Sequence, residues 1–203
     1  MSYKSKMNLQ DLESNSPKIE KFFENDVDII TFDKRWSESN SRILLKILDY
    51  EVATSNIVIQ WAPFDWIEFS TDKDDCWFTI KCKRKRKDKD LFSFYYNENI
   101  YKNHYTWWEE NISKYKKNIR GFLQIGYNPG WFIDQSMMHI YHATNYFVDK
   151  KCTVVNMLPN VIIQHEQYRN DEFYLSKIKD HFLYNQIIKN SEIVLNNQGD
   201  YYW

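Results

Sequence analysis

Two histidines at helical spacing are the residues of this sequence most suited to chemistry. His139 and His142 stand three positions apart in a segment with helical periodicity, so both imidazoles lie on one face of the expected helix. That arrangement can hold a metal ion if carboxylates or further histidines converge on it. The surrounding residues complete no known zinc spacing, and histidines on a polar helix face are the ordinary case. We therefore expect no metal and no cofactor, and a small enzyme using His139 and His142 remains an alternative.

Other catalytic patterns are not found in the sequence. Glu109 and Glu110 follow a tryptophan pair, but acidic residues in the first turn of a helix are explained by its dipole. A phosphate-binding loop or a nucleophile elbow needs glycine, and the chain has only four glycines. These patterns predict a protein that is not an enzyme.

Three cysteines leave an odd thiol. Cys76 and Cys82 lie six residues apart in a segment predicted to be a strand, roughly 20 Å when extended. They cannot bond to each other in that geometry. A disulfide would therefore use Cys152 or a second molecule, and buried thiols in a reducing compartment are the alternative.

A run of basic residues lies between two predicted strands: Lys83, Arg84, Lys85, Arg86 and Lys87. Such a run is typical of a nuclear import signal, and the alternative is a solvated hairpin tip. The whole chain has 27 basic and 28 acidic residues and a net charge of -1. This balance argues against a specific nucleic-acid partner.

The stretch from His104 to Val148 predicts the elements around which the chain is organised. Thr106 and Glu109 have the spacing of a capping box, and an apolar stripe follows at helical intervals: Trp108, Ile112, Tyr115, Ile119, Phe122. A turn signal, residues 126–130, separates it from a second stripe: Ile133, Met137, Ile140, Thr144, Phe147. Two helices joined by a short turn are expected to pack as a hairpin.

Further elements are predicted on either side of this pair. Residues 76–82 alternate apolar and polar side chains and can pair with residues 91–96 as an antiparallel β-hairpin. Residues 27–32, 57–61 and 152–163 read as strands, and residues 66–69 alternate in the same way. Ser37 or Ser39 caps a helix with an apolar face of Ile43, Leu44, Ile47 and Leu48, and Asn56 ends it. A last helix starts at Asn170 or Asp171 and runs as far as Leu195.

The fold class expected from these elements is α+β and predominantly α-helical. It comprises the central helical hairpin, a small antiparallel β-hairpin and extended terminal arms. Residues 1–16 form an N-terminal arm, 17–195 a single globular domain, and 196–203 a C-terminal aromatic arm. The last three residues, Tyr201, Tyr202 and Trp203, follow a polar spacer and are expected to dock on another copy of the chain in self-assembly.

The aromatic content is high for a chain of 203 residues. It includes 15 Tyr, 13 Phe and 8 Trp, more than one core of this size can bury, so many are expected in protein–protein contacts. A net charge near zero allows copies to approach without repulsion. No apolar run is long enough to span a membrane, and the N-terminus has no hydrophobic signal-peptide region, so we expect a chain kept inside a cell.

Two short strings resemble the occlusion-body proteins of insect viruses, the polyhedrins of baculoviruses and their nudivirus relatives. They are Tyr105-Thr106-Trp107 and the segment Val154-Val155-Asn156-Met157-Leu158-Pro159. The resemblance covers about nine residues. It implies a structural protein that crystallises in the nucleus of infected host cells, encloses and protects virions, and dissolves at alkaline pH. The implied partners are other copies of the chain and virions, and the crystals then persist outside the host. The baculovirus β-sandwich is not expected here, because the chain reads as mostly helical.

Two other functions remain open on the sequence alone. One is a soluble intracellular binding protein, such as an immunity protein or a host-directed viral factor. The other is the small enzyme based on His139 and His142. Ordered particles in an expressing cell would favour the occlusion-body protein, whereas a monomer or dimer at high concentration would favour the binding protein.

Overall fold

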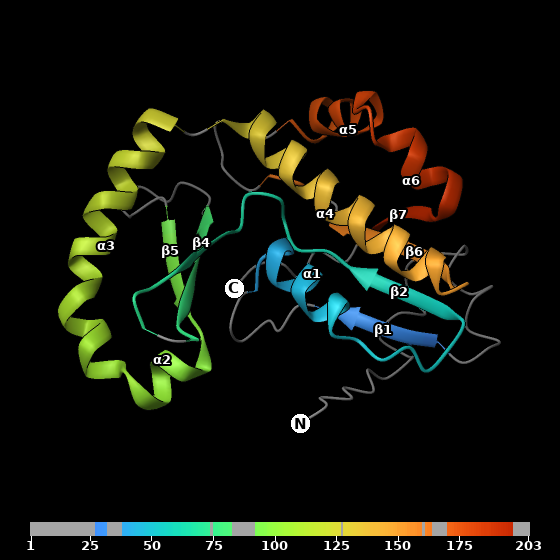
Figure 1. The fold of residues 1–203 in the computed structure, drawn as a ribbon. Helices are drawn as coiled ribbons and strands as arrows, with labels where there is room; N and C mark the ends of the chain where they lie inside the picture. The colour runs from blue at the N-terminus through green and yellow to red at the C-terminus, as the bar shows by residue number, and fades with distance from the viewer. Residues whose placement is uncertain are drawn as a thin grey trace.

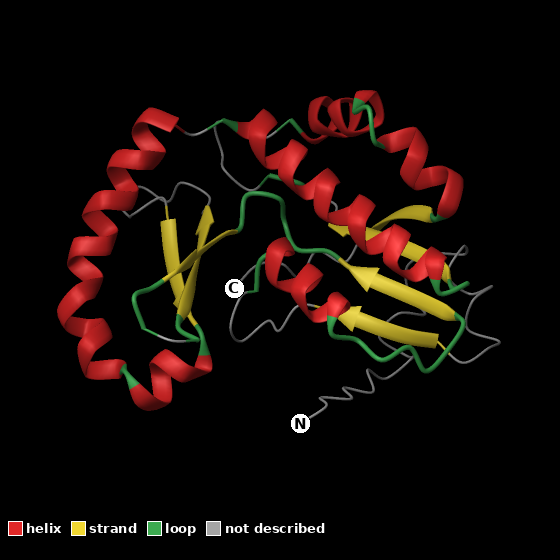
Figure 2. Cartoon of the chain, in the orientation of Figure 1, coloured by secondary structure: helices red, strands yellow, loops and turns green. Residues whose placement is uncertain are grey.

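The computed structural model describes residues 27–31, 38–73, 75–82, 92–126, 128–159, 161–163 and 170–196. Within these ranges the chain forms two lobes, each built on its own sheet (Figure 1). The strands are β1 (Val27–Thr31), β2 (Asn56–Gln60), β3 (Ile67–Ser70), β4 (Trp77–Cys82), β5 (Phe92–Tyr96), β6 (Thr153–Pro159) and β7 (Glu192–Asn196). The helices are α1 (Asn40–Leu48), α2 (Glu98–Asn103), α3 (Tyr105–Gly126), α4 (Pro129–Asp149), α5 (Asp171–Asp180) and α6 (Tyr184–Asn190). The class is mixed α/β (Figure 2).

The larger lobe is a four-stranded parallel sheet in the order β1-β2-β6-β7. Each new strand is added on the same side of the previous one. Because parallel crossovers are right-handed, this order puts all the crossover helices on one face of the sheet. Accordingly, α4 packs between α1 and α6 over the sheet (Figure 1).

Both faces of the parallel sheet are apolar and buried, as parallel sheets require. Ile57, Ile59, Val154 and Leu158 point to the helices and join the main core with the inner residues of α4. The alternate residues form a second buried cluster on the opposite face: Val58, Val155, Met157, Val194. This two-sided burial explains why the strands read as short continuous apolar runs.

The smaller lobe is an antiparallel sheet in the order β3-β4-β5, with α3 along one face (Figure 1). Phe78 on β4 lies at the centre of its core, 5.1 Å from the Trp108 ring and 5.4 Å from the Tyr115 ring, centroid to centroid. The predicted β-hairpin is therefore confirmed, with β3 as a third strand. As predicted, Cys76, Phe78 and Ile80 share one face of β4.

The predicted helical hairpin is not observed. Helices α3 and α4 diverge from their short connection, α3 along the smaller sheet and α4 over the larger one (Figure 1). The reason is that the apolar stripe of α3 is already used by the three-stranded sheet, where Trp108 and Ile119 are buried. A short turn brings two helices together only when both stripes lack another partner.

Some of the predicted helix ends are confirmed and others are wrong. The Ser39 hydroxyl accepts a hydrogen bond from the Arg42 amide and caps α1, and Asn170 caps α5 in the same way. However, α1 ends at Leu48, and Asn56 begins β2. Helix α3 starts at Tyr105, so Thr106 lies inside it rather than at a capping box.

The last predicted helix is three elements. Helix α5 ends at Asp180, α6 follows from Tyr184 to Asn190, and Glu192–Asn196 is strand β7. The centre of β7 consists of branched apolar residues, Ile193, Val194 and Leu195. They pair with β6 and complete the parallel sheet. The predicted N-terminal arm, 1–16, lies outside the described residues. So does the predicted C-terminal arm, 196–203, except for Asn196, which ends β7.

Candidate functional site

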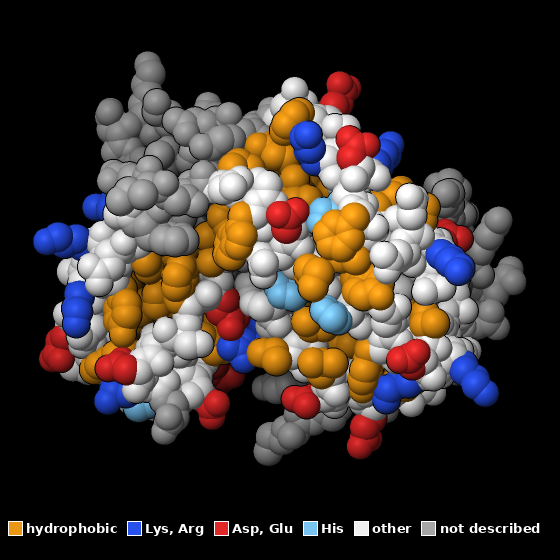
Figure 3. Space-filling model, turned by 45° about the horizontal axis from the view of Figure 1, so that its top comes forward, with side chains coloured by type: hydrophobic (Ala, Val, Ile, Leu, Met, Phe, Trp, Pro, Cys, Tyr) orange, Lys and Arg blue, Asp and Glu red, His pale blue; other side chains and the backbone are white. Residues whose placement is uncertain are grey.

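The outer face of the helical layer carries large apolar side chains that the larger sheet does not cover. Leu45 and Leu48 on α1 are each 49% exposed, and Phe182, between α5 and α6, is 72% exposed. Further exposed residues of this kind are Trp131, Met138, Phe173 and Ile188. Figure 3, which brings the α4, α5 and α6 side of the molecule forward, shows hydrophobic side chains close together with histidines among them. We call these seven residues the helical patch.

Helix α1 contributes to the helical patch because it carries more apolar residues than its inner face can use. Ile43 and Ile47 point into the core and are fully buried, and Leu44 is half-buried beside them. Leu45 and Leu48 then point outward. The sequence predicts a helix carrying Ile43, Leu44, Ile47 and Leu48, and of these Leu48 is exposed. The sequence contained a signal for this exposure. Five of the six residues from Ile43 to Leu48 are apolar, whereas a packed helix needs only about three apolar residues in seven.

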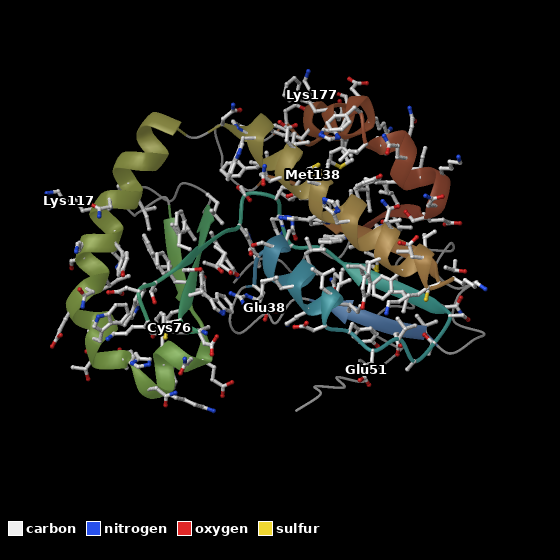
Figure 4. All side chains as sticks on the ribbon, in the orientation of Figure 1. Glu38, Glu51, Cys76, Lys117, Met138 and Lys177 are labelled. Atoms are coloured by element: carbon white, nitrogen blue, oxygen red, sulfur yellow. The ribbon has the colours of Figure 1, made fainter. Side chains whose placement is uncertain are left out.

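Charged residues of both signs are exposed on the helices that carry the helical patch. Lys46 lies on α1 and Asp49 just after it, Asp134 lies on α4, and Lys177 and Lys189 lie on α5 and α6. Figure 4 shows Met138 on α4 and Lys177 on the neighbouring α5. An apolar area with charges of both signs on the same helices can complement a second copy of itself about a two-fold axis.

The two histidines singled out by their spacing lie on α4, next to one another on the helix. His142 is exposed, whereas His139 is half-buried, and no described residue bonds its Nδ1 atom. Burial, and to a lesser extent His142, lowers the pKa of His139, so its imidazole is neutral at neutral pH. No three His, Cys, Asp or Glu side chains converge on a metal-sized site within the described ranges.

A polar junction connects the two lobes. The Arg42 guanidinium on α1 donates hydrogen bonds to both oxygens of Glu68 on β3, at 2.6 and 3.3 Å, and lies 4.6 Å from the Trp77 ring centroid. The Ser39 hydroxyl donates to the same carboxylate. Glu38, which pairs with Lys46, lies at the start of α1 between the lobes (Figure 4). The junction therefore fixes α1 against the smaller sheet.

Lys81 on β4 is the most perturbed amine described. Its Nζ atom lies 3.6 Å from the Trp66 ring centroid and 4.3 Å from that of Tyr95. Burial lowers the pKa of Lys81 from 10.5 to about 7. Nothing in the sequence indicates this, because the alternation of β4 places Lys81 on the polar face. In the folded protein, Trp66, which lies in the connection between β2 and β3, packs over that face. This packing removes the amine of Lys81 from water.

A shallow cleft of about 850 Å³ opens beside the junction. Its lining includes Arg42, Lys73 and Lys102 together with Asp75 and Glu98. Charges of both signs alternate around it, and Cys76 at its edge is only 3% exposed. The Thr71 hydroxyl in the lining donates to the backbone carbonyls of Lys73 and Cys76 rather than to a base, and we assign no reaction to the cleft.

The three cysteines are the candidates for a disulfide. Cys76 and Cys152 are buried thiols outside any disulfide, and burial raises the pKa of Cys152. Figure 4 shows Cys76 between the smaller sheet and the helices beside it. Cys82 ends β4, opposite Phe92. An intermolecular disulfide through Cys76, Cys82 or Cys152 remains a prediction.

Two other predicted sites lie outside the described residues. They are the aromatic hook Tyr201, Tyr202 and Trp203, and the basic run Lys83, Arg84, Lys85, Arg86 and Lys87. Their proposed roles, in self-assembly and in nuclear import, remain predictions.

Comparison with known proteins gives no relative: no protein family, no curated protein and no solved structure matches the chain. Among the described residues, no helix is both long and apolar enough to cross a membrane. In this structure the polyhedrin-like segment Val154–Pro159 belongs to β6, an interior strand buried on both faces. Burial by itself explains most of its apolar residues, so the function must be argued from the surface.

Proposed function

We propose that this protein is a structural protein that self-associates through the helical patch. The observation that carries the proposal is the exposure of seven large apolar side chains on one helical layer. Single exposed apolar residues are ordinary, whereas groups of them mark interaction sites. Leu45 and Leu48 on the same exposed face of α1 give the patch a ridge that a second helix can pack against.

The charge distribution supports a second copy as the occupant. The net charge is -1, so two copies do not repel each other strongly. The exposed charges on the helices that carry the helical patch are of both signs, with Lys177 on α5, Lys189 on α6 and Asp134 on α4. A partner of a different kind that carried a strong charge of one sign would meet like charges somewhere among them. A two-fold related copy can instead pair each basic residue with an acidic one.

Substitution of Leu45 and Leu48 by glutamate is expected to prevent association. Two charges would be buried at the centre of the contact, which weakens binding by at least about 30-fold, or ~2 kcal/mol. Light scattering coupled to size-exclusion chromatography, from micromolar to millimolar concentration, should show a rising mass for the native chain and a monomer for the variant.

The matched control is Tyr101→Glu, which places a charge on an apolar residue of the other lobe that is 57% exposed. It should associate like the native chain, and circular dichroism should show all chains folded. A native chain that stays monomeric at millimolar concentration would contradict the proposal and favour a binding protein with a different partner. Equal association of the Leu45→Glu/Leu48→Glu variant would show that the contact lies elsewhere.

The occlusion-body protein is the specific form of this proposal, and it adds a pH dependence. Above about pH 10, lysines lose charge and tyrosines gain it, so neighbouring copies become anionic and repel one another. Burial and Asp72 both raise the pKa of Tyr115. The Tyr115 hydroxyl should therefore keep its hydrogen bond to Asp72 until a still higher pH. Particles from expressing cells should survive mild acid and dissolve above about pH 10, as followed by light scattering. Dissolution on dilution at neutral pH would exclude a protective lattice.

A further inference from the structure

The second half of α3 carries the most one-sided charge among the described residues. From Asn111 to Gly126 the helix has four basic residues and no acidic one: Lys114, Lys116, Lys117, Arg120. Lys114, Lys117 and Arg120 are exposed, and Figure 4 shows Lys117 pointing away from the body of the protein. A shallow hollow of about 440 Å³ lies here, lined by Ser113, Lys116, Lys117, Arg120 and Gly121. Gly121 adds to the open space, since a Cβ there would meet no atom within 4 Å.

The basic and acidic residues of the whole sequence nearly balance, but one helix, α3, carries an excess of positive charge. The Lys116 Nζ atom lies 5.5 Å from the Phe94 ring centroid, so the basic half of α3 runs beside the start of β5. Residues 113–121 hold four basic residues and no acidic one, in a chain with 27 basic and 28 acidic residues. This part of α3 is therefore basic, although the protein as a whole is near neutral.

We propose that the outer face of α3 binds nucleic acid through its phosphates, without reading base sequence. Lys114 to Arg120 spans about 9 Å along a helix, so the exposed cations Lys114, Lys117 and Arg120 follow one another every ~4.5 Å. The phosphates of a nucleic-acid strand carry one charge per ~3.4 Å of helix axis, a comparable density. The candidate site consists of the α3 residues alone.

An anionic membrane is the less suitable partner. A helix that lies in a lipid interface needs an exposed apolar face to insert. The apolar face of α3 is instead occupied by the smaller sheet, where Trp108 and Ile119 are buried and Ile112 and Tyr115 pack beside them. Its outward residues around the cations are Ser113 and Asn118, which are exposed and polar. The surface therefore offers electrostatic contacts only, which suits a phosphate polymer.

The test is fluorescence anisotropy with a labelled 24-nucleotide single strand and a 24-base-pair duplex across a salt series. We expect the native chain to bind both, with the logarithm of affinity falling linearly as the logarithm of salt concentration rises. Replacing Lys114, Lys117 and Arg120 together by Gln, a good helix former, should weaken binding at low salt by at least about tenfold. The salt slope should fall by about 2 to 3, at ~0.7–0.9 per lost phosphate contact.

The control makes the same change of charge on the other lobe, replacing the exposed Lys150, Lys151 and Lys179 by Gln. Its affinity should stay within about twofold of the native value at matched salt. If both variants lost the same affinity for nucleic acid, the effect would come from net charge, and the assignment would be overturned. Native-like affinity of the α3 variant would also overturn it. If the native chain bound phosphatidylserine vesicles but neither nucleic acid, the α3 face would be assigned to a membrane instead. If the α3 variant alone lost self-association, the face would be assigned to a second copy.

Discussion

At pH 6, the Lys81→Met variant is expected to be more stable than the native chain by about 3 kcal/mol. Each pKa unit is worth about 1.4 kcal/mol, and the pKa of Lys81 falls from 10.5 to about 7 on folding, a cost of ~5 kcal/mol when the amine is charged in both states. The rings of Trp66 and Tyr95 attract the charged amine and offset ~1–2 kcal/mol of this. Methionine keeps the apolar stem and removes the charge.

The pH dependence of this difference follows from the direction of the shift. Between pH 7 and 10.5 the unfolded chain binds a proton at Lys81 that the folded chain does not. The stability of the native chain must therefore rise with pH through this window and be lowest, for this group, below pH 7. The advantage of the methionine variant should be full at pH 6 and vanish near pH 10.5.

Urea unfolding at several pH values measures this difference. Lys102→Met is the control, because the Lys102 side chain is 63% exposed and pairs with Glu98 on the surface, so its removal should change stability by less than about 0.5 kcal/mol. If Lys81→Met were less stable than the native chain at pH 6, attraction to the two rings would exceed the cost of burial, and the pKa of Lys81 would not be lowered on folding.

Replacing Asn156 by leucine is expected to lower the free energy of unfolding by about 3 to 4 kcal/mol. Asn156 is fully buried in β6, and its amide uses every donor and one acceptor position. Its Oδ1 accepts from Trp61 Nε1 at 2.9 Å, and its Nδ2 donates to Thr144 on α4 and to Ser191 after α6, each at 3.0 Å. Leucine leaves the buried indole N–H of Trp61 without an acceptor, and each lost partner costs ~1–3 kcal/mol.

A graded series separates this network from general damage to the core. Thr144→Val removes one of the two bonds made by Nδ2 and should cost about 1 kcal/mol, because Ser191 still accepts from the amide. Near-ultraviolet circular dichroism should detect the changed environment of Trp61 in the leucine variant. A loss of less than 1 kcal/mol for Asn156→Leu would show that water replaces the amide and that the network contributes little.

Local chemistry was enough to predict several elements from the sequence. The alternation of residues 76–82 and 91–96 predicts the β4–β5 hairpin, because one face of an antiparallel sheet is buried and the other is polar. Ser39 and Asn170 predict the starts of α1 and α5, since their side chains bond amides within the same turn. Each of these signals involves residues within a few positions of one another.

Tertiary structure decided the features that depend on distant residues. The parallel sheet pairs Asn56 with Thr153 and Val155 with Glu192, and such pairs leave no local pattern because both faces are buried. For the same reason Ile193 to Leu195 reads equally well as the end of a helix. The divergence of α3 from α4 depends on the three-stranded sheet, which offers α3 a better partner than the adjacent helix.

The candidate functional surfaces divide in the same way. Composition by itself indicated association, through many aromatic residues and a net charge of -1. Which apolar residues stay exposed was decided by the packing of α1, where Ile43 and Ile47 take the inner face and leave Leu45 and Leu48 outside. The basic face of α3 is exposed because the apolar stripe of α3 packs on the three-stranded sheet, which leaves Lys114, Lys117 and Arg120 outside. Burial and charge separation are sums over neighbours in space, and these neighbours are brought together only by the fold.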